Sequence, residues 1–209
     1  LPLTLFPYTT LFRSKMIESN MIGDINYIYS NRLSFGKVRS QEDVIWSFAP
    51  HDISMILAIA KDLPLSLRTY SSRILQKDIA DTAIINMDFQ SGLRAHISVS
   101  WINPYKEQKL VVFGKNGVLV FDDTKPWVEK LAIYKHSIEF SSNEFLLNQS
   151  EFEYISVKES EPLKNECNHF VEVVNGFKYP KTNGNEGLNV IKVLSGATES
   201  QTNNKSVKL

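Results

Sequence analysis

The sequence contains a single cysteine, Cys167, among its 209 residues. One thiol cannot form a disulfide within the chain and cannot build a cysteine-based zinc site, so we exclude a disulfide-stabilised scaffold and a cysteine metal cluster. A reducing, cytoplasmic location fits this composition. No apolar run approaches the roughly 20 residues that a membrane-spanning helix needs, and we therefore expect no membrane segment.

The sequence also lacks an excess of charge of either sign. Its 23 Lys and Arg residues balance 23 Asp and Glu residues, and no basic stretch stands out. This balance argues against nucleic acid or an anionic membrane as the main partner. The remaining composition, 43% hydrophobic and 22% charged, is that of a globular protein with one sizeable core.

Several motifs that carry chemistry are absent as well. The sequence has no G-x-G-x-x-G or Walker turn for phosphates, no H-E-x-x-H or C-x-x-C for a metal, and no G-x-S-x-G nucleophile motif. Asp122 and Asp123 end an apolar run, and we interpret them as a solvated turn. The chain therefore carries no self-sufficient catalytic set, and the placement of single polar residues becomes the guide.

Residues 46–57 contain the histidine best placed for chemistry, His51. Pro50 suits the first turn of a helix, because the N–H that it lacks would have no partner there. Behind it, apolar residues recur at helical spacing, at Ile53, Ile56, Leu57 and Ala60. We therefore expect a helix within residues 42–61, either continuous or broken near Pro50. His51 and Asp52 would then lie in a first turn that faces solvent. A helix start with an ordinary polar first turn also explains the pattern.

Alternating polar and apolar residues indicate strands along much of the chain. We expect them at residues 22–33, 63–72, 81–89, 93–101, 108–114, 118–123 and 130–136, with a short one at 155–158. Gly92 and the pair Asn116-Gly117 mark tight turns between neighbouring strands. We interpret residues 140–154 as a polar surface loop and residues 203–209 as a frayed end.

Two further helices are expected, at residues 163–175 and 186–200. Leu188, Ile191 and Leu194 share one face of the second helix, which we expect to face inward. The order of elements predicts an α+β fold, with an open, mainly antiparallel sheet of about six strands and helices on one face. The other face of such a sheet needs a cover, which predicts another domain or a second subunit.

Several local phrases resemble the C-terminal domain of the glucose–fructose oxidoreductase, inositol dehydrogenase and MocA (GFO/IDH/MocA) family. They are Ile22-Gly-Asp-Ile25, Ala49-Pro-His-Asp-Ile53, Asp81-Thr-Ala83, Ser91-Gly-Leu93, Ser100-Trp101, Gly114-Lys-Asn-Gly117 and Glu186-Gly-Leu188. The resemblance implies that residues 15–209 are the substrate-binding and oligomerisation domain of an NAD(P)-dependent sugar oxidoreductase. The longer phrases YIYSNRL, WSFAPHDIS, EQKLVVFG and FDDTKPW are similar to dehydrogenases of surface-polysaccharide clusters, which act on UDP-N-acetyl amino sugars or their uronates.

The resemblance also implies roles for individual residues. It makes His51 the catalytic histidine, which acts as acid or base or holds the reacting hydroxyl group. The substrate contacts would come from Asn31, Arg32, Trp101 and Asn103, with Arg32 suited to a uronate carboxylate. A surface ion pair for Arg32 and a core or interface aromatic for Trp101 remain alternatives. The family often has Asp four residues before the histidine, where this sequence has Ser47, so the acid–base arrangement stays open.

Residues 4–14 resemble the conceptual translation of a short-read sequencing adapter. We therefore interpret residues 1–14 as non-native and exclude them from the fold. In the family, NAD or NADP is bound by an N-terminal Rossmann domain with a Gly-rich turn and a Glu-Lys-Pro motif, neither of which occurs in this sequence. We expect a truncated oxidoreductase for nucleotide-linked sugars that forms a homo-oligomer through its sheet and binds no cofactor by itself.

Two other functions fit the same residues. One is a non-catalytic sheet module that binds a sugar or a partner subunit, and the other is a dehydratase or isomerase that uses the same site with tightly held NAD. A Gly-rich turn and a Glu-Lys-Pro motif upstream would favour either enzyme over the binding module, and product analysis would separate the two enzymes. The sequence leaves open the sugar, NAD versus NADP, the oligomer size and any further C-terminal domain.

Overall fold

The computed structural model describes residues 21–157, 159, 161–180 and 183–209, so the interpretation of residues 1–14 lies outside the described residues. The helices are α2 (Val44–Ala60), α3 (Pro162–Val174) and α4 (Gly184–Asn203), and a short 3-10 turn, η2, spans Trp127–Glu129. The strands of the main sheet are β1 (Ile25–Phe35), β2 (Ser66–Ser72), β3 (Thr82–Asp88), β4 (Arg94–Ser100), β5 (Ile102–Gly114), β6 (Gly117–Asp122), β7 (Leu131–Tyr134), β10 (Phe152–Tyr154) and β11 (Val207–Lys208).

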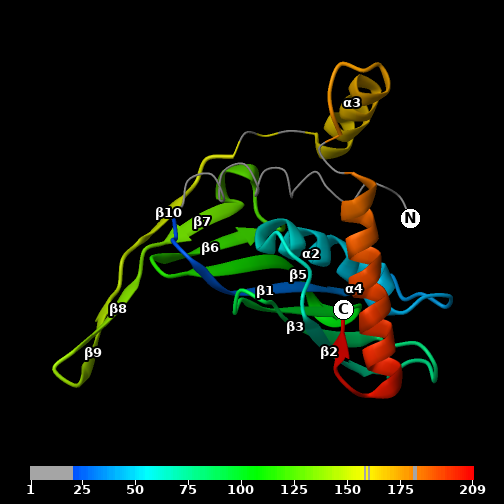
Figure 1. Ribbon diagram of the computed structural model, residues 1–209, viewed down its shortest axis with the longest axis horizontal. Helices are drawn as coiled ribbons and strands as arrows, with labels where there is room; N and C mark the ends of the chain where they lie inside the picture. The colour runs from blue at the N-terminus through cyan, green and yellow to red at the C-terminus, as the bar shows by residue number, and fades with distance from the viewer. Residues whose placement is uncertain (1–20, 158, 160, 181–182) are drawn as a thin grey trace.

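The main sheet contains nine strands within the described part of the chain, in the order β10-β7-β6-β5-β1-β4-β3-β2-β11. Every neighbouring pair is antiparallel except β1 and β4, which run parallel. Helices α2 and α4 lie on the same side of this sheet (Figure 1). The predicted α+β fold with an open, mainly antiparallel sheet and helices on one face is therefore confirmed.

The sheet has nine strands and not about six, because short strands complete both edges. Residues 152–154 pair with β7, whereas the sequence placed a strand at residues 155–158, which begin one residue after β10 ends. Residues 207–208, interpreted as frayed, pair with β2. Strands of two or three residues are too short for alternation to reveal, and only their pairing with a neighbour identifies them.

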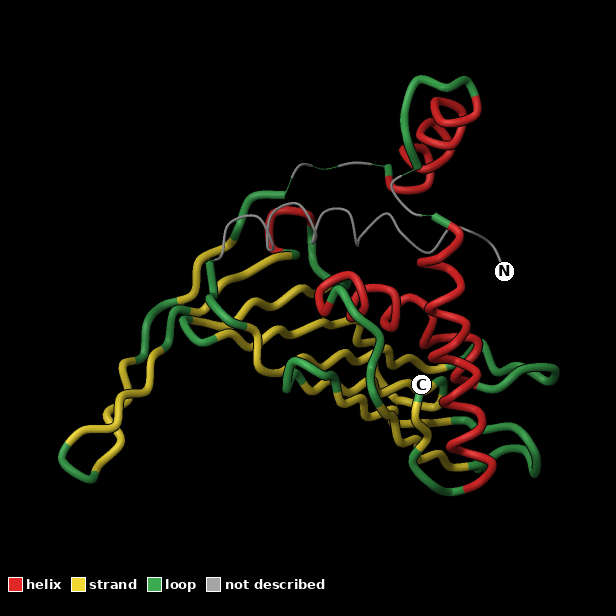
Figure 2. Tube along the Cα trace, viewed as in Figure 1, coloured by secondary structure: helices red, strands yellow, loops and turns green. Residues whose placement is uncertain are grey.

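A second, two-stranded sheet is formed by β8 (Ser137–Ser141) and β9 (Glu144–Asn148), which project from the main sheet as a hairpin (Figure 2). The interpretation of this region as an irregular loop is wrong. Ile138 lies opposite Leu147 and Phe140 opposite Phe145, so one face of the hairpin carries apolar side chains. Two short apolar runs around a polar turn are easily taken for a loop in a sequence.

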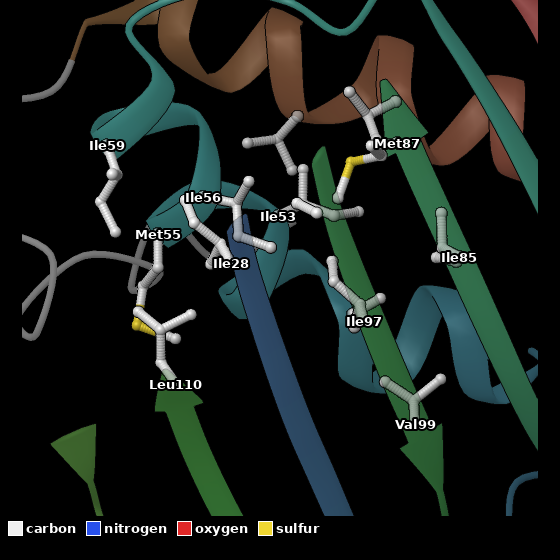
Figure 3. Close-up of a cluster of buried hydrophobic side chains, with 14 of the residues drawn as sticks. Ile28, Ile53, Met55, Ile56, Ile59, Ile85, Met87, Ile97, Val99 and Leu110 are labelled. Carbon is white, nitrogen blue, oxygen red and sulfur yellow. The ribbon is translucent and has the colours of Figure 1, made fainter. Parts of the chain in front are cut away.

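The core lies between the sheet and the two helices (Figure 3). Ile28 of β1 and Ile97 of β4 are completely buried, and so are Ile53 and Ile56 of α2. Alternate residues of each strand point to this side, and none of the helices that the structure describes covers the opposite side of the sheet (Figure 1). Burial of this apolar surface is the main favourable contribution to folding.

Helix α2 lies within the expected residues 42–61 and continues through Pro50, but it begins at Val44 and not at Pro50. Asp43 is its N-cap, since its carboxylate accepts the backbone N–H of Ile45 and of Trp46. Pro50 therefore lies in the helix interior, where it provides no N–H for the carbonyl group of Trp46. The expectation that His51 and Asp52 occupy a solvent-facing first turn is wrong, because the helix covers the sheet along its whole length.

Helix α4 also presents a different face to the core than expected. Leu194 is completely buried as predicted, but Leu188 is 49% exposed and Ile191 is 38% exposed. The buried residues are Val190, Val193, Leu194, Gly196, Ala197 and Ser200. Small residues such as Gly196, Ala197 and Ser200 form the buried face, because the helix packs closely against β2. There the Ser200 hydroxyl accepts the backbone N–H of Thr69 at 2.9 Å.

Candidate functional site

The candidate site is built around Asp52 on α2, whose side chain is 1% exposed. The alternation of β1 places Ser30 and Arg32 on the face of the sheet that α2 covers. The Ser30 hydroxyl donates to Oδ1 of Asp52, and Nε of Arg32 donates to Oδ2 of Asp52 at 2.6 Å. A buried carboxylate needs such partners, so this network holds both the carboxylate and the Arg32 guanidinium in place.

A small pocket opens beside this network. It is lined by Arg32, His51, Asp52, Met55, Gln108, Lys109, Leu110, Phe121 and Asp123. Its cavity volume is about 70 Å³, which is room for a few water molecules, whereas small-molecule sites typically enclose roughly 300–1,000 Å³. A larger ligand would therefore place one group in the pocket and extend over the surrounding surface.

His51 lies next to Asp52 on α2 and is half-buried at the pocket wall. Met55 follows it by one helical turn, and the two side chains line the same cavity. Ser47 precedes His51 by one turn on the same helix. The helix therefore presents an imidazole to the pocket, while the neighbouring carboxylate of Asp52 faces the sheet.

Asp123 brings a second carboxylate to the pocket, from the end of β6. Its side chain is 16% exposed and forms an ion pair with Lys130, whose side chain is 10% exposed. The ammonium group of Lys130 also lies 3.3 Å from the carbonyl oxygen of Asp123 and 4.6 Å from the centre of the Trp127 ring. A turn does follow Asp122, but the interpretation of Asp122 and Asp123 as solvated is wrong for both, because their side chains are 15% and 16% exposed.

The structure brings Arg32 and His51 together, but it places Asn31 on the opposite face of the sheet. There the Asn31 amide donates to the Glu107 carboxylate at 2.8 Å. Neighbouring residues in a strand point to opposite faces, so Asn31 and Arg32 cannot serve one pocket. Asn31 and Arg32 were predicted together as substrate contacts, because the sequence alone does not show on which face of the sheet the ligand site lies.

The structure also places Trp101 and Asn103 away from the pocket. Trp101 is completely buried, and its indole N–H donates to Oδ1 of Asp81 at 2.7 Å. The Asn103 amide donates to the carbonyl oxygen of Tyr105 at 2.7 Å, at the start of β5. Of the alternatives left open by the sequence, the core aromatic describes Trp101 in this structure.

Sequence reasoning missed Asp52, Ser30 and Asp123 as site residues. A signal for Asp52 exists in the sequence, because it stands in line with Ile45, Ala49, Ile56 and Ile59 at alternating spacings of four and three. A carboxylate within such an apolar stripe must find a buried partner. For Ser30 and Asp123 the sequence offers no comparable signal, because their positions depend on strand pairing.

No group of three or more His, Cys, Asp or Glu side chains in the described residues is placed to hold a metal ion. Among the helices that the structure describes, none is long and apolar enough to cross a membrane.

Comparison with known proteins identifies a family and related folds. The family model described as the GFO/IDH/MocA C-terminal domain matches residues 13–120. Among solved structures, UDP-N-acetylglucosamine 3-dehydrogenase GnnA from Acidithiobacillus ferrooxidans matches with a TM-score of 0.72 at 19% identity, covering 92% of this chain and 60% of that one. A search of curated proteins gives no match.

Two other solved structures contain ligands. A levoglucosan dehydrogenase in complex with NADH and levoglucosan has a TM-score of 0.78 at 13% identity, covering 99% of this chain and 65% of that one. The WlbA dehydrogenase from Bordetella pertussis, in complex with NADH and UDP-GlcNAcA, has a TM-score of 0.67 at 16% identity, covering 96% and 59%. At these identities the likeness shows the fold alone. The chain spans less than two thirds of the length of each of these structures.

Proposed function

The chain belongs to the GFO/IDH/MocA family by its C-terminal domain, and on this premise we propose that it provides the substrate site of an NAD(P)-dependent oxidoreductase. The proposed substrate is a hydroxyl group of a nucleotide-linked sugar, a UDP-N-acetyl amino sugar or its uronate. The observation that carries the proposal is the pocket in which His51 and Arg32 meet. Similar folds in complexes with NADH and a sugar or a UDP-sugar support it.

His51 has the residue type that oxidation of a hydroxyl group needs. The hydroxyl proton must leave during the reaction, and an imidazole within hydrogen-bond reach can accept it near neutral pH. In this proposal His51 accepts that proton or holds the hydroxyl group in position. The half-buried location of His51 limits the access of water to the proton.

Arg32 suits the anionic part of such a substrate. A guanidinium group presents several N–H donors in one plane and can bind a carboxylate or phosphate through two of them. Asp52 orients the guanidinium group by accepting a hydrogen bond from Nε at 2.6 Å, and the Arg32 side chain remains 18% exposed. An arginine that is already held in place loses less entropy when it binds a ligand.

The N-termini of α2 and α4, the two helices that pack on the sheet, do not offer a free dinucleotide site. Helix N-termini bind pyrophosphate through backbone N–H groups, but the N-terminus of α2 is occupied by the carboxylate of Asp43. At the N-terminus of α4, the side chain of Asn183 accepts the corresponding N–H groups. In this proposal NAD or NADP is therefore bound by another domain, and residues 15–209 act only on the substrate.

Reading the coding sequence upstream of residue 15, with primers free of adapter sequence, tests the proposed division into residues 1–14 and 15–209. An upstream βαβ unit with a Gly-rich turn and a Glu-Lys-Pro motif, in frame with residue 15, would support the oxidoreductase. A start codon immediately upstream would instead favour the sheet module that binds a sugar or a partner subunit, and the enzyme proposal would fall.

The first prediction concerns His51 in the complete protein. We expect His51→Ala to lower turnover of UDP-N-acetylglucosamine or its uronate by about 10²- to 10⁴-fold, with little change in NAD binding. Steady-state kinetics and NAD titration measure the two effects. His136→Ala is the matched control, because His136 accepts the backbone N–H of Ser150 at the base of the hairpin and does not line the pocket. Unchanged turnover in His51→Ala would remove His51 from the mechanism.

A further inference from the structure

Asp122 is the last residue of β6 and Asp123 is the first residue after it, and the two carboxylates have different partners. Asp122 lies 3.8 Å from the ammonium group of Lys109 and accepts the backbone N–H of Thr124. Asp123 lines the pocket and pairs with Lys130. Of these two neighbouring carboxylates, only Asp123 lines the pocket, although the sequence does not distinguish between them.

The backbone around Asp123 is anchored from both neighbouring strands. The N–H of Asp123 donates to the carbonyl oxygen of Gln108 in β5 at 2.8 Å. The N–H of Asp122 donates to the carbonyl oxygen of Lys130, next to β7, also at 2.8 Å. These hydrogen bonds hold the backbone at the pocket end of β6, and they thereby fix the position of the Asp123 Cα atom.

The ammonium group of Lys130 fixes the carboxylate of Asp123. It contacts both the carboxylate oxygen Oδ1 and the backbone carbonyl of Asp123, and it lies over the Trp127 ring. Both side chains of the pair are mostly buried, and a buried charge must be paired. A carboxylate offers about four acceptor sites, so the contact with Lys130 leaves Asp123 able to accept hydrogen bonds from a ligand.

We propose that Asp123 binds a hydroxyl group of the sugar ring, and that Lys130 is the positioning residue that holds its carboxylate. This proposal rests on the proposed function, because it takes the ligand to be a sugar. A carboxylate only accepts hydrogen bonds and repels anions, whereas Arg32 only donates them and attracts anions. The pocket thereby distinguishes the two ends of a substrate, with a hydroxyl group at Asp123 and an anionic group at Arg32.

Isothermal titration of the chain with UDP-N-acetylglucosamine and with its monodeoxy analogues tests the proposal. We expect Asp123→Asn to weaken binding by about 10- to 100-fold, the usual effect of losing a charge-assisted hydrogen bond. The matched control is Asp122→Asn, which changes the neighbouring carboxylate that does not line the pocket and should leave the affinity within about twofold. One deoxy analogue, which lacks the hydroxyl group bound by Asp123, should bind the wild type more weakly than the parent sugar does. The Asp123→Asn variant should bind this analogue and the parent sugar with equal affinity.

The positioning role of Lys130 has its own readout. Lys130→Met should weaken binding as Asp123→Asn does, Lys130→Arg should restore most of the affinity, and Lys130→Met should cause no further loss in an Asp123→Asn background. Thermal unfolding shows which variants fold. Asp123→Asn could fail to fold because Lys130 loses its carboxylate partner. In that case the double variant Asp123→Asn/Lys130→Met, which removes both charges, is titrated in place of Asp123→Asn.

The outcomes separate this proposal from the proposed function. No binding of any UDP-sugar by the wild type would contradict the proposed function. Binding by the wild type with unchanged affinity in folded Asp123→Asn, or in the folded double variant, would overturn the role of Asp123. Equal affinity of the wild type for every deoxy analogue would overturn it as well, even if no variant folds.

Discussion

Asp81 is a fully buried carboxylate that connects three segments of the chain. Its Oδ1 accepts the indole N–H of Trp101, and its Oδ2 accepts the backbone N–H groups of Ile74 at 2.7 Å and of Leu75 at 2.8 Å. Burial alone would raise the pKa of this carboxyl, but the three hydrogen bonds outweigh burial and lower the pKa of Asp81 below its ordinary value. Trp101 thus stabilises a charge inside the fold.

Trp101→Phe should lower the free energy of unfolding at neutral pH by about 1–3 kcal/mol, because a buried carboxylate loses a donor. The pKa of Asp81 is lower in the folded than in the unfolded chain, so its stabilisation is complete above the ordinary Asp pKa of about 3.9 and is lost as the pH falls through the folded value. Urea unfolding should therefore show a difference between wild type and Trp101→Phe that shrinks on acidification.

Phe48→Leu provides the control for this prediction. The Phe48 ring packs edge-on against Trp101, with centroids 6.3 Å apart. Its replacement removes packing at the same place without removing a donor to Asp81. The destabilisation by Phe48→Leu should be similar at neutral and acid pH. If the loss caused by Trp101→Phe is equally independent of pH, packing and not the hydrogen bond to Asp81 accounts for it.

At the scale of the element, α2 is the helix that carries both the core and the site. It starts at the Asp43 cap and ends at Lys61, which adopts the left-handed conformation with φ 57° and donates its N–H to the carbonyl oxygen of Leu57. Between these ends, the helix turns Ile53 and Ile56 into the core and brings His51 to the pocket. The start of the helix therefore determines which residues can reach the ligand.

Asp43→Ala should destabilise the chain by about 1 kcal/mol, because two backbone N–H groups at the start of α2 lose their acceptor. Urea unfolding with an unchanged m-value measures this effect. Glu42→Ala is the neighbouring control, since Glu42 forms only an exposed pair with Arg39 at 3.7 Å, and it should cost less than about 0.5 kcal/mol. Equal effects of the two substitutions would show that the cap contributes nothing particular.

At the scale of the whole molecule, α2 and α4 cover one face of the sheet, and no helix in the described part of the chain covers the other face, called the open face here (Figure 1). Near the centre of the open face, Tyr29 stacks on His96 with ring centroids 5.5 Å apart, and Tyr27 donates to Nδ1 of His96 or accepts from it. Burial lowers the pKa of His96, and burial together with Tyr29 raises the pKa of Tyr27, so both groups favour their neutral forms. Neutral aromatic side chains are common at the centre of protein interfaces.

We propose that a second copy of the chain covers this open face, as the resemblance to the family implied. Ile84→Glu then tests the proposal, because Ile84 lies on the open face of β3 and is 43% exposed. We expect this charge to raise the dissociation constant of the oligomer by at least about tenfold, since a buried unpaired charge is costly. Val128→Glu is the control, because Val128 is 66% exposed on η2, outside the sheet.

Sedimentation equilibrium across the micromolar range measures the association of the wild type and both variants. The variant Val128→Glu should associate like the wild type, whereas Ile84→Glu should shift toward monomer. A wild type that remains monomeric over this range would contradict the proposed self-association. An equal shift in both variants would show that added charge in general, and not the open face, changes the association.

The sequence supported most of the fold because alternation and turn residues are local signals. The strand at residues 81–89 and its partner at 93–101 were recognised with their turn, where Gly92 adopts φ +86°. The helix within residues 42–61 was recognised, but Pro50 was wrongly assigned to its first turn, because proline is also a local signal for a helix start. The edge strands at residues 152–154 and 207–208 are too short to carry a pattern of their own.

The sequence by itself determined the fold class, the family and the placement of His51 on a long helix. These depend on the order of residues along the chain, where period and turn chemistry act over a few positions. Only the tertiary structure decided which polar residues share a site. Pairing of β1 and β6 with their neighbours sends Arg32 and Asp123 to the pocket, whereas Asn31 lies on the opposite face and Asp122 does not line the pocket. A shift of one residue reverses the face of a strand, and strand register depends on contacts between distant parts of the chain.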